Sequence, residues 1–293
     1  MDGILSVIKP AGMTSFDVVA YIRNRFGGTK IGHTGTLDPD ACGLMILCIG
    51  KATKMTGYMM ASEKTYMAEL RLGIRTDTLD SSGEVTSRTG YIYDRKRLGD
   101  ILPVFIGGIL QKPPMYSAVK INGRRLYESA RKGIEVEREA RQVFVRSISV
   151  TDDSDPQSIM LRITCSKGTY IRSLIADIGE QYGCGAHTGF LLRISDGPFN
   201  IACAYTLEEI TQAAANGEAG HLMTDLEEYF GQKDKIVLNE NEMKVFINGA
   251  FVKRADLTEI IEYAVFDPSG LFLGIGETIE KGTEVCLKAK RLL

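Results

Sequence analysis

An apolar run enclosed by two glycines, Gly43-Leu-Met-Ile-Leu-Cys-Ile-Gly50, is the feature that most constrains the fold of this chain. A continuous apolar run of this length, closed by turn residues, is typical of a buried β-strand. Residues 66–73 alternate between apolar and polar side chains, as a strand with one buried face does. Strand-like runs of this kind alternate with helical patterns over the first 200 residues. This alternation predicts a mixed α/β or α+β domain.

A helix is predicted at residues 169–182, where apolar residues recur at spacings of three and four. Thr169 is suited to cap its start, and Gly183 is suited to stop it. Its first turn carries Tyr170 and Arg172. A second helical stretch is expected at residues 206–215.

A change in pattern near residues 231–235 predicts a linker. Beyond it, two short strand-like runs at residues 262–266 and 270–274 are separated by the turn signal Asp267-Pro-Ser-Gly270, and an earlier turn signal, Asn248-Gly249, precedes both. The predicted domains are therefore residues 1–230 and 236–293, and the second is long enough for a small β-barrel.

The six cysteines form no Cys-x-x-Cys pair, which argues against a disulfide framework or a zinc ribbon and favours reduced thiols. The first apolar run, at residues 4–8, is too short for a secretory signal. No apolar stretch reaches the roughly 18 residues of a membrane-spanning helix. We therefore expect a soluble, cytoplasmic protein that does not contact membranes.

Charge is distributed unevenly. The net charge is −2, but residues 111–146 hold nine Lys or Arg against four Glu, a balance of +5. Residues 201–293 hold nine basic and sixteen acidic residues, a balance of −7. A basic island of this kind is compatible with RNA binding. A solvated helical face explains the same composition equally well.

The segment with most chemical potential is Lys30-Ile-Gly-His-Thr-Gly-Thr-Leu-Asp-Pro-Asp40. Pro39 favours an extended conformation at Asp38, and glycines allow close approach of backbone or ligand. These features hold a carboxylate at the end of a loop, directly before the buried run. The alternative from spacing alone is an Asp-Pro turn in which Asp38 caps a neighbouring N–H.

The stretch Gly32-His-Thr-Gly-Thr-Leu-Asp-Pro-Asp-Ala-Cys-Gly-Leu44, with Gly50-Lys-Ala-Thr-Lys54 after it, resembles the signature of the bacterial tRNA pseudouridine-55 synthases, the TruB family. Four later blocks resemble the same family in the same order: residues 64–66, 73–80, 113–120 and 166–172. The resemblance implies an α+β pseudouridine synthase domain with a mainly antiparallel sheet, interrupted by the basic insertion at 111–146. The C-terminal unit resembles, more loosely, a PUA-type RNA-binding module.

The resemblance implies that Asp38 is the catalytic aspartate and that Arg172 is its partner. Tyr66 would stack on the flipped base. From the residues alone, an Arg on a first helical turn is more often a surface residue, and Tyr66 fits a half-buried strand position.

The other implied substrate-binding residues are His33 beside the displaced uridine, Tyr170 and Leu191 lining the pocket, Lys54 near phosphates, and Arg124 and Arg125 in the insertion. A lone His in a Gly-rich turn can equally bond the backbone.

The implied reaction cleaves the N1–C1′ bond of uridine, turns the base and joins C5 to C1′. The reaction is redox-neutral and needs neither cofactor nor metal. Cys184 and His187 lack further ligands at metal-binding spacing. A carboxylate can serve as a nucleophile on the sugar, as a nucleophile on the base, or as the base that deprotonates C2′.

The expected substrate is the T stem-loop of tRNA, bound by a monomer without an obligate protein partner. Three alternatives stay open: an RNA-binding protein or tRNA chaperone, a role that can coexist with catalysis; a guide-RNA-dependent relative; and a glycoside hydrolase. The last needs a second carboxylate, for which Asp40 is the nearby candidate.

Overall fold

A computed structural model of the chain describes residues 1–117, 119–121, 123–130, 132–282 and 284–293, with only the backbone at Arg124 and Arg125. Within these residues, no helix is both long and apolar enough to cross a membrane.

The N-terminal unit is organised by one large sheet. Its strands are β1 (Gly3–Lys9), β2 (Ile31–His33), β3 (Cys42–Ile49), β4 (Lys64–Leu72), β7 (Gly107–Gln111), β10 (Arg141–Asp155), β11 (Ser158–Cys165), β12 (Ala186–Asp196), β13 (Phe199–Asn200) and β14 (Met223–Thr224). The order among the described strands is β14-β1-β3-β12-β4-β11-β10-β7, with β2 beside β3 and β13 beside β12. The β3–β12 pair is parallel, and the other pairs are antiparallel. The predicted strands and the mainly antiparallel sheet are confirmed.

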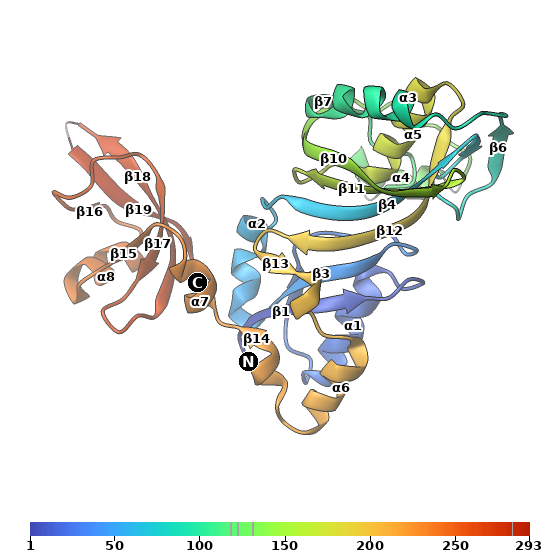
Figure 1. Ribbon diagram of the computed structural model, residues 1–293. Coiled ribbons are helices and arrows are strands. Elements are labelled where there is room, and N and C mark those ends of the chain that lie inside the picture. The colour runs from blue at the N-terminus through green and yellow to red at the C-terminus, as the bar shows by residue number, and fades with distance from the viewer. Residues whose placement is uncertain (118, 122, 131, 283) are drawn as a thin grey trace.

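Helices cover the sheet in two groups (Figure 1). Helices α3 (Arg95–Ile101) and α5 (Ile171–Tyr182) lie over β4, β11 and β10. Helices α1 (Ser15–Arg25) and α6 (Leu207–Ala215) pack on β1 and β3. Gly43, with φ of 102°, has no room for a side chain, because a Cβ there would lie 2.4 Å from the Arg193 carbonyl oxygen. A glycine is therefore needed where β3 meets β12.

The predicted helix at 169–182 is confirmed except at its start. Helix α5 begins at Ile171, and Tyr170 occupies the cap position without a capping side chain. Thr169 as the cap was wrong, because its hydroxyl donates to the Ser166 carbonyl at 2.9 Å. Gly183, with φ of 93°, ends the helix as predicted.

Short elements complete this unit: α2 (Thr56–Met59), β5 (Ile74–Thr76), β6 (Val85–Arg88), β8 (Lys120–Ile121), β9 (Arg124–Arg125), α4 (Leu126–Ala130) and α7 (Leu226–Gly231), with 3-10 turns at Gly50–Met55, Leu102–Phe105, Ile201–Cys203 and Ala219–Leu222. Gln111 ends β7 and Arg141 begins β10. The described residues of the basic insertion between 112 and 140 therefore lie outside the main sheet.

The C-terminal unit contains β15 (Lys235–Val237), α8 (Glu240–Ile247), β16 (Val252–Lys253), β17 (Glu262–Phe266), β18 (Phe272–Lys281) and β19 (Glu284–Leu292). These described strands form a sheet in the order β15-β17-β18-β19-β16, and a small C-terminal β domain is confirmed. Phe230 of α7 stacks on Phe272 at 4.3 Å between ring centroids. Both rings belong to an apolar cluster that includes residues of β1 and β3, so the two units share buried surface.

Candidate active site

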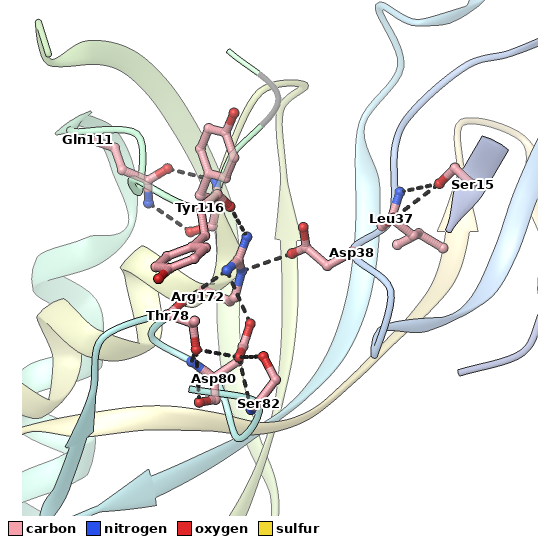
Figure 2. Close-up of polar contacts among 10 residues, drawn as sticks. Ser15, Leu37, Asp38, Thr78, Asp80, Ser82, Gln111, Tyr116 and Arg172 are labelled. Atoms are coloured by element: carbon pink, nitrogen blue, oxygen red, sulfur yellow. Dashed lines mark hydrogen bonds and ion pairs between the residues drawn. The ribbon is translucent and has the colours of Figure 1, made fainter. Parts of the chain in front are cut away.

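Asp38 lies in the loop between β2 and β3, and its neighbours are fixed. Leu37 is 4% exposed within the apolar core. Its N–H donates to Ser15 Oγ at 2.9 Å, and Ser15 Oγ lies 3.1 Å from the Leu37 carbonyl oxygen. The Ala41 N–H donates to the Asp38 carbonyl at 3.2 Å. The backbone on both sides of Asp38 is therefore anchored, as Figure 2 shows for Leu37 and Ser15.

Lys9 also stabilises this loop, through hydrogen bonds to its backbone carbonyls. The sequence-based predictions did not include this residue. Its side chain is fully buried, and Nζ donates to the carbonyls of Pro10, Pro39 and Ala41 at 2.9, 2.9 and 2.6 Å. Burial lowers the pKa of Lys9, and nearby acidic groups including Asp38 oppose this. The available signal was a lysine that closes an apolar strand directly before a proline.

Replacing Lys9 with Met should leave the Pro39 and Ala41 carbonyls without their buried donor. We expect a loss of about 1–3 kcal/mol in the free energy of unfolding, measured by urea denaturation. Lys30→Met, a change at an exposed lysine, is the control. Equal stability of the two variants would contradict the role given to Lys9.

Asp38 forms an ion pair with Arg172, whose Nε lies 2.8 Å from Asp38 Oδ2. The Arg172 side chain is 5% exposed, whereas that of Asp38 is 38% exposed. Desolvation of the carboxylate by the surrounding protein raises the pKa of Asp38 above its ordinary value, and the positive charge of Arg172 opposes this rise. The carboxylate is thus paired on one side and accessible on the other, as a nucleophile or general base must be.

Arg172 is held by acceptors from separate segments (Figure 2). Nη1 donates to the Thr78 carbonyl at 2.9 Å and to Asp80 Oδ2 at 3.1 Å, and Nη2 donates to the Tyr116 carbonyl at 2.8 Å. The surface position that the residue pattern alone favours for Arg172 is wrong. The fixed guanidinium leaves Nε beside Asp38.

The turn that presents Asp80 is tightly constrained. Leu79 has φ of 65°, and it is the non-glycine residue with positive φ in the described part of the chain. Its carbonyl accepts from the Thr188 N–H at 3.0 Å, which ties the turn to β12. Asp80 Oδ1 accepts from the Thr78 and Ser82 hydroxyls, both at 2.6 Å. Asp80 is therefore engaged through both oxygens and anchors Arg172.

A second buried polar cluster holds the segment before Asp38. Thr34 Oγ1 donates to Asp196 Oδ2 at 2.9 Å, and Lys64 Nζ lies 3.0 Å from Asp196 Oδ1. Arg193, 1% exposed, donates through Nη2 to the Gly35 carbonyl at 3.3 Å. A Cβ at Gly35 would lie 3.1 Å from Arg193 Nη1, so the missing side chain leaves room for this guanidinium.

His33 lies at the end of β2 and is partly buried. Burial lowers the pKa of His33, and the positive charge of Arg193 lowers it further. Both effects favour the neutral imidazole.

Comparison with known proteins identifies the family. Residues 23–171 match the model of the TruB family pseudouridylate synthase N-terminal domain, and residues 172–232 match that of the tRNA pseudouridylate synthase B C-terminal domain. The chain belongs to the TruB family. It is 44% identical to the tRNA pseudouridine synthase B of Clostridium kluyveri, over 94% of this chain and 95% of that protein. It is 40% identical to the protein of that name from Caldanaerobacter subterraneus, over 100% of this chain and 99% of that protein.

Solved structures share the fold of this TruB-family chain. A chain of a Cbf5-Nop10-Gar1 complex matches with a TM-score of 0.76 and 24% identity, covering 99% of this chain and 84% of that one. A chain of the archaeal box H/ACA sRNP Nop10-Cbf5 complex matches with a TM-score of 0.73 and 21% identity, covering 99% and 85%. At these identities the likeness shows the fold.

Tyr66, Tyr170 and Leu191 are three of the active-site residues that the TruB resemblance implies, and they lie around the Asp38 loop. Tyr66 is 8% exposed and belongs to the same apolar cluster as Leu37, and Leu191 packs against that cluster. Burial raises the pKa of Tyr66 to about 12. Burial also raises the pKa of Tyr170, and the charge of Asp38 adds to this effect. Their roles toward a bound base stay predictions.

The remaining predicted residues are not joined to the Asp38 group by contacts that the structure gives. Lys54 is exposed, and its carbonyl accepts from Arg291 Nε of the C-terminal unit at 2.9 Å. Arg124 and Arg125 form β9, and their side chains lie outside the described residues. Asp40, the candidate second carboxylate of a glycoside hydrolase, is exposed.

Proposed function

We propose that this chain isomerises uridine to pseudouridine in tRNA, with Asp38 as the catalytic carboxylate. The observation that carries the proposal is the ion pair of a buried Arg172 with a solvent-accessible Asp38, 2.8 Å apart. Membership of the TruB family and the names of the curated relatives support the reaction and the substrate.

The reaction breaks the N1–C1′ bond of uridine and forms a bond between C5 and C1′. The proton on C5 is lost to solvent, and N1 gains a proton, so the product is an isomer of the substrate. Asp38 supplies the anionic oxygen that acts as nucleophile or base. The positive charge of Arg172 favours the ionised form of Asp38. The Nη donors of Arg172 are already occupied, so the guanidinium is fixed beside this carboxylate.

A stacked and paired uridine cannot reach a carboxylate in a loop, so the base must be turned out of the RNA. We propose that the target is uridine 55 in the T loop, as in the family that the sequence resembles. Tyr66, Tyr170, Leu191 and His33 would surround the extruded nucleotide. Residues 1–230 would form the catalytic domain and residues 236–293 a PUA-type RNA-binding domain of a monomeric, cytoplasmic enzyme.

The proposal is tested with the purified chain alone and a tRNA transcript labelled with tritium at C5 of uridine. We expect tritium release without any guide RNA, and release that persists after exhaustive chelation with a pre-folded transcript. A transcript with cytidine at position 55 should release none. Release that requires a guide RNA, or that is unaffected by the cytidine substitution, would contradict the proposal.

The basic insertion is expected to contact phosphates through Arg124 and Arg125. In the double variant Arg124→Gln/Arg125→Gln, the slope of log affinity against log salt should fall by about 0.7 to 0.9 for each lost contact. Filter binding over a range of salt concentrations measures this slope. The matched control is the double variant Arg95→Gln/Lys96→Gln, which changes two consecutive basic residues of α3. It should leave the slope unchanged. An unchanged slope in the insertion variant would assign these arginines to a solvated face.

A further inference from the structure

The side-chain amide of Gln111 binds the backbone of Tyr170, two residues before Arg172. Its Nε2 donates to the Tyr170 carbonyl at 3.0 Å, and the Tyr170 N–H donates to its Oε1 at 2.7 Å. Gln111 is 2% exposed. It therefore forms a buried, two-point connection to Tyr170, the residue at the cap position of α5. Figure 2 shows the two dashed lines that leave the Gln111 amide.

Gln111 also stands where the basic insertion leaves the sheet, because it is the last residue of β7. Two more contacts join the start of this insertion to the first turn of α5. The Arg172 Nη2 donates to the Tyr116 carbonyl at 2.8 Å, and the Ser173 hydroxyl lies 3.5 Å from the Lys112 carbonyl oxygen. The segment at 111–116 and the turn at 170–173 are thus joined at three places.

We propose that Gln111 is a positioning residue for the isomerisation. It fixes the first turn of α5 against the first residues of the insertion, so that the Arg172 guanidinium lies beside Asp38. The inference rests on the proposed function and deepens it, because it links the segment expected to hold RNA to the catalytic ion pair. Gln111 does not touch the reacting atoms, and it acts through Tyr170 and Arg172.

A primary amide is suited to this position. It carries a donor and an acceptor side by side, as one face of a peptide group does, and so satisfies both backbone groups of Tyr170. Met has a similar length and offers neither strong group. Asn keeps the amide but is one methylene shorter, so it cannot reach both partners without a shift of the backbone.

The test compares Gln111→Met with the parent chain in single-turnover tritium release from tRNA, with enzyme in excess. A small displacement of Arg172 should lower the rate constant by up to about 100-fold. The dissociation constant for tRNA should be unchanged, because Gln111 is buried. Gln111→Asn keeps a polar group in the buried site and carries the test if the Met variant does not fold. Gln157→Met, in the exposed turn between β10 and β11, is the control.

A pH profile separates positioning from general destabilisation. Asp38 is faced by Arg172, Asp80, Lys9 and Tyr170. Arg172 lowers the pKa of Asp38 against the effect of burial, so retracting Arg172 should raise this pKa. The rate requires the ionised carboxylate and falls as the pH drops through that pKa. The acidic limb of the variant profile should therefore move to higher pH.

Three results would overturn the proposal: a rate constant equal to that of the parent, weaker tRNA binding with an unchanged rate constant, or a lower rate that follows thermal stability with an unmoved acidic limb. Failure of the proposed function is a separate result, because an inactive parent chain contradicts that function whatever the variants do.

Discussion

Replacing Asp38 with Asn is expected to abolish turnover while the chain stays folded and still binds tRNA. Asn keeps the size and much of the hydrogen bonding of Asp but removes the charge and the reactive oxygen. The rate constant for tritium release should fall by more than about 10⁴-fold. Stability should change by about 1 kcal/mol or less, because the Asp38 side chain is 38% exposed and Asp80 still pairs with Arg172.

Asp40→Asn is the matched control, because Asp40 lies two residues along the same loop and is exposed. It should retain the activity of the parent. Mass spectrometry must exclude deamidation of the introduced Asn side chain back to Asp, and filter binding with thermal melting reports on the same preparations. Residual activity of the Asp38→Asn variant within about tenfold of the parent would reject the catalytic role of Asp38, since loss of a reacting group costs far more.

Arg172→Lys is expected to have the second-largest effect, although the charge is kept. A single ammonium cannot meet the Thr78 carbonyl, Asp80 and the Tyr116 carbonyl together and still lie beside Asp38. We expect the single-turnover rate constant to fall by about 10² to 10³-fold, the range seen when one preorganised electrostatic contact is lost.

Arg172→Met should lower activity and should also destabilise the fold by about 3 kcal/mol. This value is at the low end of the cost of removing one partner from a buried ion pair, because the Asp38 side chain is partly exposed to solvent. Arg162→Lys, a change at an exposed arginine of β11, is the control for both variants. Urea denaturation and single-turnover assays measure the two quantities. An Arg172→Lys variant as fast as the parent would show that the guanidinium fork is not needed.

The main sheet and α5 could be predicted because their signals are local. The apolar run at 43–50 became β3, which is buried on both faces. The alternation at 66–73 became β4, whose second face is also partly covered, because Thr65 and Glu69 are buried. The end of α5 was predictable because Gly183 adopts a left-handed conformation that favours glycine. Its start was not, because the Thr169 hydroxyl is taken by the Ser166 carbonyl.

The candidate site was predictable only in part. The loop that presents Asp38 has local signals in its glycines and its Asp-Pro step. The burial of Arg172 has none, because its acceptors come from Thr78, Asp80 and Tyr116, which lie 56 to 94 residues away in the sequence. The supporting residues Lys9 and Gln111 act on backbone groups of distant segments, and no spacing rule reveals such contacts.

The measurement that tests the account most directly is the mapping of pseudouridine in an unmodified tRNA after incubation with the purified chain alone. The account predicts pseudouridine at the T-loop uridine with the parent chain, and none with the Asp38→Asn variant at equal tRNA occupancy. Absence of pseudouridine with the parent chain, or its formation by the variant at the same position, would contradict the account.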